Sequence, residues 1–340
     1  MAAHPGRDLV VVAASAGGVE PLRTLVAGLP SDLPAAVLVV LHVSASGGSA
    51  LAGILDRAGP LKAAPAEDGA PIVAGEVRVA VPDHHLFARE GTQRLSRGPR
   101  YNGHRPAADL LFMSAALDAG SRVAGVVLSG TLDDGARGSA TVEHHGGAVA
   151  VQDPQECAFG GMPAAALRAT ARAQALPASL LADWVVRQSR TPTGEEEAGV
   201  EETVPDLEIE RELARHLATR PPETPAGDLA GFTCPECDGP LYEQRSVPAS
   251  RYTCRVGHSW SMDAMASGQA DAVERALWVA IQRLEERLRL LSRMGRAARE
   301  RGHRVSVRRL GAEAEETRQA LETIRTLQNR LGSGEGVANA

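Results

Sequence analysis

LVVVAASAGG, residues 9–18, is the stretch that decides the fold of this chain. Six apolar residues rich in valine run without interruption and stop at Ser15, and glycines follow at positions 17 and 18. A short apolar run that ends in glycines before a helical pattern is typical of a buried parallel strand entering a helix. Ser15 is therefore expected at the carboxyl edge of a sheet, where α/β proteins bind their ligands.

Ser15 has an ordinary interpretation as well as a chemical one. A serine before glycines at a strand end commonly forms a turn or caps a helix. A nucleophilic serine needs a base, and the base needs an orienting acid. Two further apolar runs supply both, because residues 35–41 lead directly into His42 and residues 123–128 lead toward Asp134. Taken alone, His42 can equally be a structural histidine, but strand ends in a parallel sheet share one edge, where the three side chains can converge.

The first half of the chain alternates strand and helix patterns throughout. This alternation predicts an α/β fold with a doubly wound, mostly parallel sheet. Short runs near residues 86–88 and 93–95, with Glu90-Gly91 between them, predict a local hairpin. Further strands are predicted over 77–81 and 148–152, and helices over 21–29, 49–57, 107–119, 136–145 and 163–171.

Residues 8 to about 188 resemble the catalytic domain of the CheB-type protein-glutamate methylesterases of bacterial chemotaxis. The matching segments keep the family's order and about its spacing. They are AASAGGVEPL (13–22), VVLHVSAS (39–46), GEVRVAVPDHHL (75–86), RPAADLLFMSAA (105–116), GVVLSGTLDDGARG (125–138) and VAVQDPQECAFGGMPAAAL (149–167). The resemblance implies a CheB methylesterase-like fold and the hydrolysis of glutamyl methyl esters on receptors, with deamidation of glutamine by the same chemistry.

The resemblance also implies roles for single residues. It places the family's catalytic triad on Ser15, His42 and Asp134. Asp133 is the rival acid, but the family's aspartate directly precedes the glycine that Gly135 matches. The turn after the serine, at Ala16 and Gly17, and the loop at Thr131 are the segments expected to bind substrate and hold the oxyanion.

Two positions depart from the family's pattern. The family commonly has threonine after its nucleophile, where this chain has Ala16, and Met-Gly where this chain has Thr131-Leu132. We expect these differences to affect substrate choice and rate while leaving the triad in place, because a single oxyanion donor contributes roughly 10²–10³ in rate.

Composition limits the classes of protein that this chain can be. Its 340 residues predict about two domains, and its net charge of −6 gives no overall attraction to nucleic acid. No apolar run approaches the roughly 20 residues of a membrane span, and the first residues show no signal-peptide core, so we expect a cytoplasmic protein without membrane insertion. We also expect no control through the family's N-terminal receiver domain, since only residues 1–7 precede the match.

Three of the four cysteines are grouped in residues 232–260, FTCPECDGPLYEQRSVPASRYTCRVGHSW. Cys234 and Cys237 form a C-x₂-C knuckle, and Cys254 and His258 form C-x₃-H. Three thiolates and an imidazole predict a closed, structural Zn²⁺ site in a zinc-ribbon-like module, while catalysis needs no cofactor. A redox role for C-x₂-C would require a thioredoxin-like helix start, which is absent. Cys157 stands apart and is interpreted as a packing residue.

The rest of the chain is predicted to be modular. The expected segments are a catalytic domain (1–188), an acidic linker (189–229), the zinc-ribbon-like module (230–262), a helical hairpin (263–331) and a disordered tail (332–340). The linker's acidic run is interpreted as solvated or as paired with the basic helix, and a short helix is expected over 206–219.

Apolar residues recur at steps of four and three in the last segment, which predicts an antiparallel helical hairpin or coiled-coil arm. They are Leu277, Ile281, Leu284, Leu288 and Leu291, followed by Leu310, Ala314, Thr317, Leu321 and Ile324. The arginines between residues 283 and 309 form either a solvated face or a face for an acidic partner. Self-association or a coiled-coil partner through 263–331 is an open expectation.

Three functional hypotheses remain at this point. The first is a protein-glutamate methylesterase that uses a methylated receptor or another signalling protein as substrate. The second is a weakly active esterase-fold scaffold that recruits signalling partners through its zinc module and helical arm, which the changes at Ala16 and Thr131-Leu132 motivate. The third is nucleic-acid binding through the zinc module and the arginine-rich helix, which the acidic net charge and the scarcity of aromatic residues disfavour.

Overall fold

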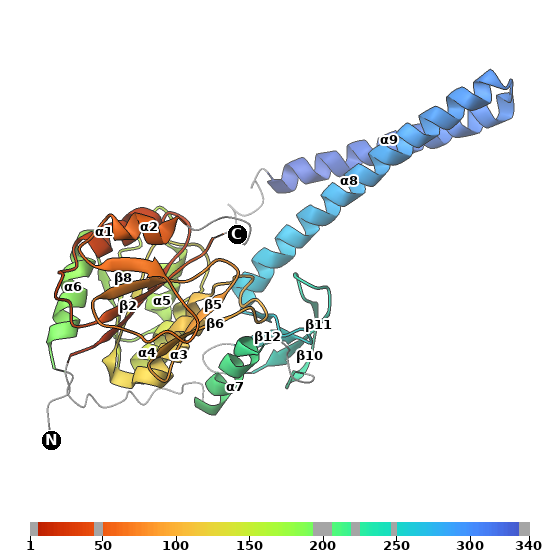
Figure 1. Ribbon diagram of the computed structural model, residues 1–340. Coiled ribbons are helices and arrows are strands. Elements are labelled where there is room, and N and C mark those ends of the chain that lie inside the picture. The colour runs from red at the N-terminus through yellow and green to blue at the C-terminus, as the bar shows by residue number, and fades with distance from the viewer. Residues whose placement is uncertain (1–5, 44–49, 193–205, 219–224, 246–249, 333–340) are drawn as a thin grey trace. The chain divides into compact units, whose positions relative to one another are not determined.

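The apolar run that ends at Ser15 forms β1 (Leu9–Ala14), the middle strand of a seven-stranded sheet in the computed structural model (Figure 1). The structure describes residues 6–43, 50–192, 206–218, 225–245 and 250–332. The other strands of this sheet are β2 (Ala36–Leu41), β3 (Lys62–Pro65), β4 (Glu76–Val79), β7 (Val123–Val127), β8 (Ala148–Gln152) and β9 (Gln174–Leu176). Their order is β3-β4-β2-β1-β7-β8-β9, and every neighbouring pair is parallel.

Helices cover both faces of this sheet, as the strand–helix alternation predicted (Figure 1). They are α1 (Val19–Ala27), α2 (Leu51–Asp56), α3 (Ala108–Ala119), α4 (Ala136–His144), α5 (Gly161–Ala169) and α6 (Ala178–Arg190). Side chains alternate between the faces of a strand. Val10 and Val12 therefore lie in one core with α1, α2 and α6, while Val11 and Ala13 lie in the opposite core with α3, α4 and α5.

The chain order makes β1 the point where the sheet changes direction. From β1 the chain moves outward through β2, and it later returns to place β7 on the other side of β1. Ligand sites of open α/β sheets lie at such a switch point, outside the carboxyl ends of the strands. The end of β1 at Ser15 occupies this position.

The predicted hairpin is also present, as β5 (His85–Arg89) and β6 (Thr92–Ser96) with Glu90 and Gly91 at its turn. The sequence interpretation contained neither the helix α6 nor the strands β3 and β9. The two strands are short and lie at the edges of the sheet, and neither segment has the apolar alternation that marks a strand.

Part of the expected acidic linker is an ordered helix. α7 (Asp206–Leu217) buries Ile209 and Leu213 against side chains of α3 and β5, including Phe87. Its acidic Glu212 is buried and pairs with Arg137 of α4, so this part of the acidic run is neither solvated nor paired with the basic helix. Residues 193–205 of the expected linker lie outside the described residues.

The cysteine-rich segment forms a second, four-stranded antiparallel sheet. Its strands, in spatial order, are β10 (Asp228–Thr233), β11 (Pro240–Gln244), β12 (Arg251–Cys254) and β13 (Ser259–Trp260). This segment and the parallel-sheet domain belong to one compact unit, Met1–Met265, and Ala266–Ala340 form another.

The predicted helical arm consists of α8 (Met262–Glu300) and α9 (Arg304–Gly332). Gly302, with φ of 72°, lies in the turn between them, and Leu291 and Leu310 are buried where the helices meet. Several arginines of the arm pair with its own glutamates, such as Arg325 with Glu285 at 2.6 Å. Among the described residues, no helix is both long and apolar enough to cross a bilayer. Of the expected tail, residues 333–340 lie outside the described part.

Candidate active site and metal centre

Ser15 opens a tight turn immediately after β1. Its N–H donates to the carbonyl of Ser129, which follows β7, at 2.9 Å, and its own carbonyl accepts from the N–H of Gly18 at 3.0 Å. Gly17 has a φ of 71°, and a Cβ there would lie 2.7 Å from the Cβ of Ala158. The turn therefore needs glycine both for its left-handed backbone and for its space.

A second glycine lets another loop approach the serine. A Cβ on Gly130 would lie 2.8 Å from the Cβ of Ser15, so only a glycine allows the loop after β7 this close. Within the described part of the chain, the N–H groups of Ala16 and Thr131 donate no hydrogen bond. Two main-chain donors beside the serine are what an oxyanion site requires. Leu132 follows with a φ of 62°, a strained value for a leucine.

His42 follows β2 directly, and its N–H donates to the carbonyl of Ala14 at 3.1 Å, which places it at the strand end next to Ser15. Its Nε2 lies 2.7 Å from Oδ2 of Asp134. Among the described residues neither Nδ1 of His42 nor Oγ of Ser15 has a hydrogen-bond partner. The structure therefore joins His42 to Asp134 and leaves the serine contact open, which is common when no substrate is bound.

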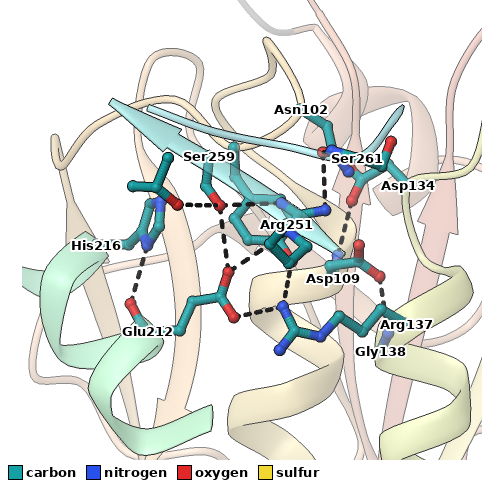
Figure 2. Close-up of polar contacts among 12 residues, drawn as sticks. Asn102, Asp109, Asp134, Arg137, Gly138, Glu212, His216, Arg251, Ser259 and Ser261 are labelled. Atoms are coloured by element: carbon teal, nitrogen blue, oxygen red, sulfur yellow. Dashed lines mark hydrogen bonds and ion pairs between the residues drawn. The ribbon is translucent and has the colours of Figure 1, made fainter. Parts of the chain in front are cut away.

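Asp134 is fixed at the start of α3. Its Oδ2 accepts from the N–H of Ala108 at 2.7 Å. Its Oδ1 accepts from the N–H of Asp109 at 3.0 Å (Figure 2). Burial alone would raise the pKa of this carboxyl, but the hydrogen bond and charge of His42 and the main-chain donors lower it to about 2. Asp134 is thus an ionised acceptor at neutral pH, able to orient the imidazole and stabilise its protonated form.

Asp109 binds the start of α4 in return. Its Oδ1 accepts from the N–H groups of Gly135 at 2.9 Å and Gly138 at 2.7 Å. Burial and the charge of Asp134 raise the pKa of Asp109 well above its ordinary value. Asp109 and Asp134 thereby connect the first turns of α3 and α4, and this support was not foreseen from the sequence.

Asp133, the rival acid, points elsewhere. Its Oδ1 accepts from the hydroxyl of Ser261, at the start of α8, at 3.0 Å. Burial raises the pKa of Asp133, and the Ser261 hydrogen bond opposes that rise. Only Asp134 of the two reaches His42, in agreement with the choice made from the position of Gly135.

His104 is a site residue that the sequence interpretation missed. Its ring stacks on the ring of His42, with centroids 3.8 Å apart and planes 7° from parallel. Burial and the neighbouring His42 lower the pKa of His104 to about 3, so it is neutral at physiological pH. It lies in a loop without periodicity, and the only available signal was its place just before the RPAADLLF segment.

Ser129 was missed as well. It is fully buried two residues after the end of β7. Its hydroxyl donates to the carbonyl of Ala16 at 2.8 Å and accepts from the N–H of Phe159 at 3.1 Å. Its own N–H donates to Oε1 of Gln152 at 3.0 Å. These bonds hold the serine turn against β7 and β8, a role that a polar residue at a strand end could have suggested.

The four predicted metal ligands converge. The donor atoms of Cys234, Cys237, Cys254 and His258 all lie within 4.8 Å of one another. Sγ of Cys237 and Sγ of Cys254 are 3.6 Å apart, and Nδ1 of His258 is 3.6 Å from Sγ of both Cys234 and Cys254. Bonds of about 2.3 Å to sulfur and 2.0–2.1 Å to nitrogen give tetrahedral edges of roughly this length. The donor set therefore fits a metal ion such as Zn²⁺.

Comparison with known proteins gives one family for the parallel-sheet domain. The family model described as CheB methylesterase matches residues 10–185. The crystal structure of the Thermotoga maritima CheB methylesterase catalytic domain is similar, with a TM-score of 0.50 and 30% identity, over 53% of this chain and 97% of that one.

Curated proteins with related names are similar over about half of this chain. A protein-glutamate methylesterase/protein-glutamine glutaminase 2 of Xanthomonas oryzae pv. oryzae is 37% identical over 185 residues, 53% of this chain and 51% of its own length. A protein-glutamate methylesterase/protein-glutamine glutaminase of Symbiobacterium thermophilum is 36% identical over 182 residues, 53% of this chain and 50% of its own. The chain spans about half the length of the curated relatives it matches.

Proposed function

This chain belongs to the CheB methylesterase family, and from that premise we propose that it is a protein-glutamate methylesterase with Ser15 as its nucleophile. The observation that carries the proposal is the buried His42–Asp134 pair at 2.7 Å, beside a serine at the switch point of a parallel sheet. The substrate class is a methylated glutamate on a receptor or another signalling protein. Localisation in the cytoplasm, where such receptors expose their signalling domains, is part of the same proposal.

The free nitrogen of His42 sets the direction of proton transfer. Nδ1 of His42 takes the proton of Ser15 as Oγ bonds to the γ-carbonyl carbon of the ester, while Nε2–H keeps its hydrogen bond to Asp134. The resulting imidazolium then gives its proton to the departing methoxide, and methanol leaves. Water, deprotonated by His42, next attacks the acyl-enzyme and releases glutamate and Ser15.

The developing oxyanion needs donors that are already in place. The N–H groups of Ala16 and Thr131, which make no other hydrogen bond among the described residues, are our candidates for this role. Attack on a glutamine side chain by the same sequence of steps would release ammonia, so we include glutamine deamidation in the proposal.

The scaffold hypothesis remains the second candidate, and the loop at Thr131 is the observation that favours it. Leu132 holds a left-handed backbone that a glycine would adopt without strain, and Ala16 supplies no hydroxyl beside the nucleophile. A sluggish oxyanion site would leave the esterase fold intact with weak activity. Partners would then be recruited through the metal module and the helical arm.

We further propose that Cys234, Cys237, Cys254 and His258 hold a structural Zn²⁺ ion. All four ligands come from the protein, so the ion would stabilise the small module and take no part in ester hydrolysis. The expected readout is about one zinc ion per chain after purification.

Methanol release from a methylated chemoreceptor fragment tests the function. The wild-type chain is expected to release methanol, and Ser15→Ala is expected to abolish the release above the uncatalysed rate. Ser31→Ala, at an exposed serine in the turn before β2, is the matched control and should retain wild-type release. Equal rates for wild type and Ser15→Ala would reject the assignment.

A further inference from the structure

The metal module joins the parallel-sheet domain through main-chain hydrogen bonds. Ser259 of β13 accepts from the N–H of Asn102 at 2.7 Å and donates to the carbonyl of Arg100 at 3.2 Å. These bonds extend the module's sheet onto the loop of residues 100–104. The contact therefore fixes backbone as well as side chains.

The side chain of Asn102 is the centre of this contact. Its Oδ1 accepts from the N–H of Ser261 at 2.9 Å and from Nη1 of Arg251 at 3.1 Å (Figure 2). The guanidinium of Arg251 also lies 4.1 Å from the centre of the Tyr101 ring, and both side chains are buried. One arginine of β12 thus holds two consecutive residues of the loop.

A buried ion cluster completes the contact. Figure 2 shows Glu212 of α7 between the guanidinium groups of Arg137 and Arg251. Burial would raise the pKa of Glu212, but the two arginines lower it to about 2. Buried ion clusters are costly to desolvate and seldom improve stability over an apolar core, so this one is better explained by the position it specifies.

The contact adjoins the residues that flank the His42–Asp134 pair. Two residues after Asn102, His104 stacks on His42, and between them Gly103 lies so close to Trp260 of β13 that a Cβ there would be 3.3 Å from the indole ring. On the other side, the hydroxyl of Ser261 binds Asp133, the neighbour of Asp134. The module therefore contacts Gly103, the neighbour of His104, and Asp133, the neighbour of Asp134.

Two of the metal ligands lie on or next to the strands that make this contact. Cys254 ends β12, three residues after Arg251, and His258 directly precedes Ser259 of β13. A metal ion bound by both would fix the turn that sets the spacing of the docking residues. A segment this small has too little core to keep that spacing alone.

We propose that the metal module is a positioning element of the esterase site, and that metal binding at Cys234, Cys237, Cys254 and His258 controls turnover through the loop of residues 100–104. Asn102, His104 and Ser261 are positioning residues in this scheme, acting through His42 and Asp134. The proposal rests on the methylesterase function proposed above. A module that served only for stability would change the folded fraction and leave kcat of the folded protein unchanged.

Hydrolysis of p-nitrophenyl acetate by the full chain provides the kinetic test, since this small ester reports on the triad without protein recognition. Ser261→Ala is expected to lower kcat at least about fivefold with KM within twofold, because a small displacement of the base is costly to rate. Ser261→Thr, which keeps the hydroxyl, should restore kcat to within twofold. Leu229→Ala, on the exposed edge strand β10 of the same module, is the control and should match wild type.

Metal removal is the second arm of the same test. Stripping the full chain with a chelator should lower kcat by a similar factor, and Zn²⁺ alone should restore it. The low-field NMR signal of the His42 Nε2 proton, assigned by its loss in Asp134→Asn, gives a readout independent of turnover. We expect the signal in wild type and Ser261→Thr, and its broadening or loss in Ser261→Ala and in the metal-free chain.

The two proposals fail in different ways. Ester hydrolysis that persists in Ser15→Ala would reject the methylesterase function, and the NMR signal would still decide the role of the module. An unchanged kcat and an unchanged signal in both Ser261→Ala and the metal-free chain would overturn the positioning proposal.

Discussion

At the scale of residues, the candidate site was predictable where chemistry coincides with strand ends. Ser15, His42 and Asp134 each follow an apolar run, and parallel pairing brings such positions to one edge. His104 and Asp109 were not predictable in this way. Their roles depend on a stacked ring and on the meeting of two helix starts, which are long-range contacts that leave no local pattern.

The two neighbouring aspartates give a matched pair of substitutions. Asp134→Asn should lower kcat by roughly 10³–10⁴, because the amide no longer holds the imidazole in the required tautomer. Asp133→Asn keeps an acceptor for Ser261 and should stay within about fivefold of wild type, since Asp133 does not contact His42. Steady-state ester hydrolysis measures both, and equal losses would contradict the assignment of the acid.

The stacked histidine pair supports a second prediction. His104→Ala should lower kcat roughly ten- to hundredfold with little change in KM, because His42 loses the surface that fixes its plane. His104→Phe keeps a flat ring and should recover most of the rate. If alanine and phenylalanine behave alike, the ring of His104 does not position His42.

At the scale of elements, the long apolar strands and most helices of the sheet domain were predicted, whereas the short edge strands and the helix α6 were not. β3 and β9 escaped because edge strands of three or four residues carry little pattern. α7 was expected as a short helix, but its acidic composition gave no indication that it packs against α3 and β5. The partners of Glu212 lie 75 residues before it and 39 residues after it (212 − 137 and 251 − 212), beyond any local signal.

The docking of α7 can be tested by its buried carboxylate. Glu212→Gln should lower the free energy of unfolding by about 3–5 kcal/mol, because it leaves the buried charges of Arg137 and Arg251 without their counter-charge. Glu210→Gln, on the exposed face of the same helix, should change it by less than about 0.5 kcal/mol. Urea unfolding measures both, and a small effect at Glu212 would show that the cluster is dispensable.

At the scale of the whole molecule, the sequence indicates separate segments but not that the cysteine-rich segment and the parallel-sheet domain belong to one compact unit. The parallel sheet, the cysteine module and the helical arm each have their own signature of periodicity or ligand spacing. The docking of the module on the loop of residues 100–104 depends on single polar contacts, such as Asn102 with Ser261. No periodicity encodes such contacts, and they place the module near the His42–Asp134 pair.

We expect the free energy of unfolding to decrease once the pH falls below about 6.5. Burial lowers the pKa of His85 to about 3 and of His216 to about 4, whereas both take up protons near pH 6.5 when unfolded. Their folded-state pKa values are depressed, so stability is complete above about pH 6.5 and is lost as pH falls toward 4.

The loss should approach about 1.4 kcal/mol per pH unit for each histidine. In His216→Gln, unfolding is expected to take up about one proton fewer than in the wild type between pH 6.5 and 4. Urea unfolding at several pH values supplies the slope, and an unchanged slope in the variant would mean that His216 does not titrate as described.

Covalent labelling of the intact chain by a serine-reactive phosphonate tests directly whether Ser15 is an activated nucleophile. We expect stoichiometric labelling, mapped by peptide mass spectrometry to Ser15, and its loss in Ser15→Ala and in Asp134→Asn. Labelling at the same rate in Asp134→Asn, or at a residue other than Ser15, would contradict a nucleophile activated by the His42–Asp134 pair.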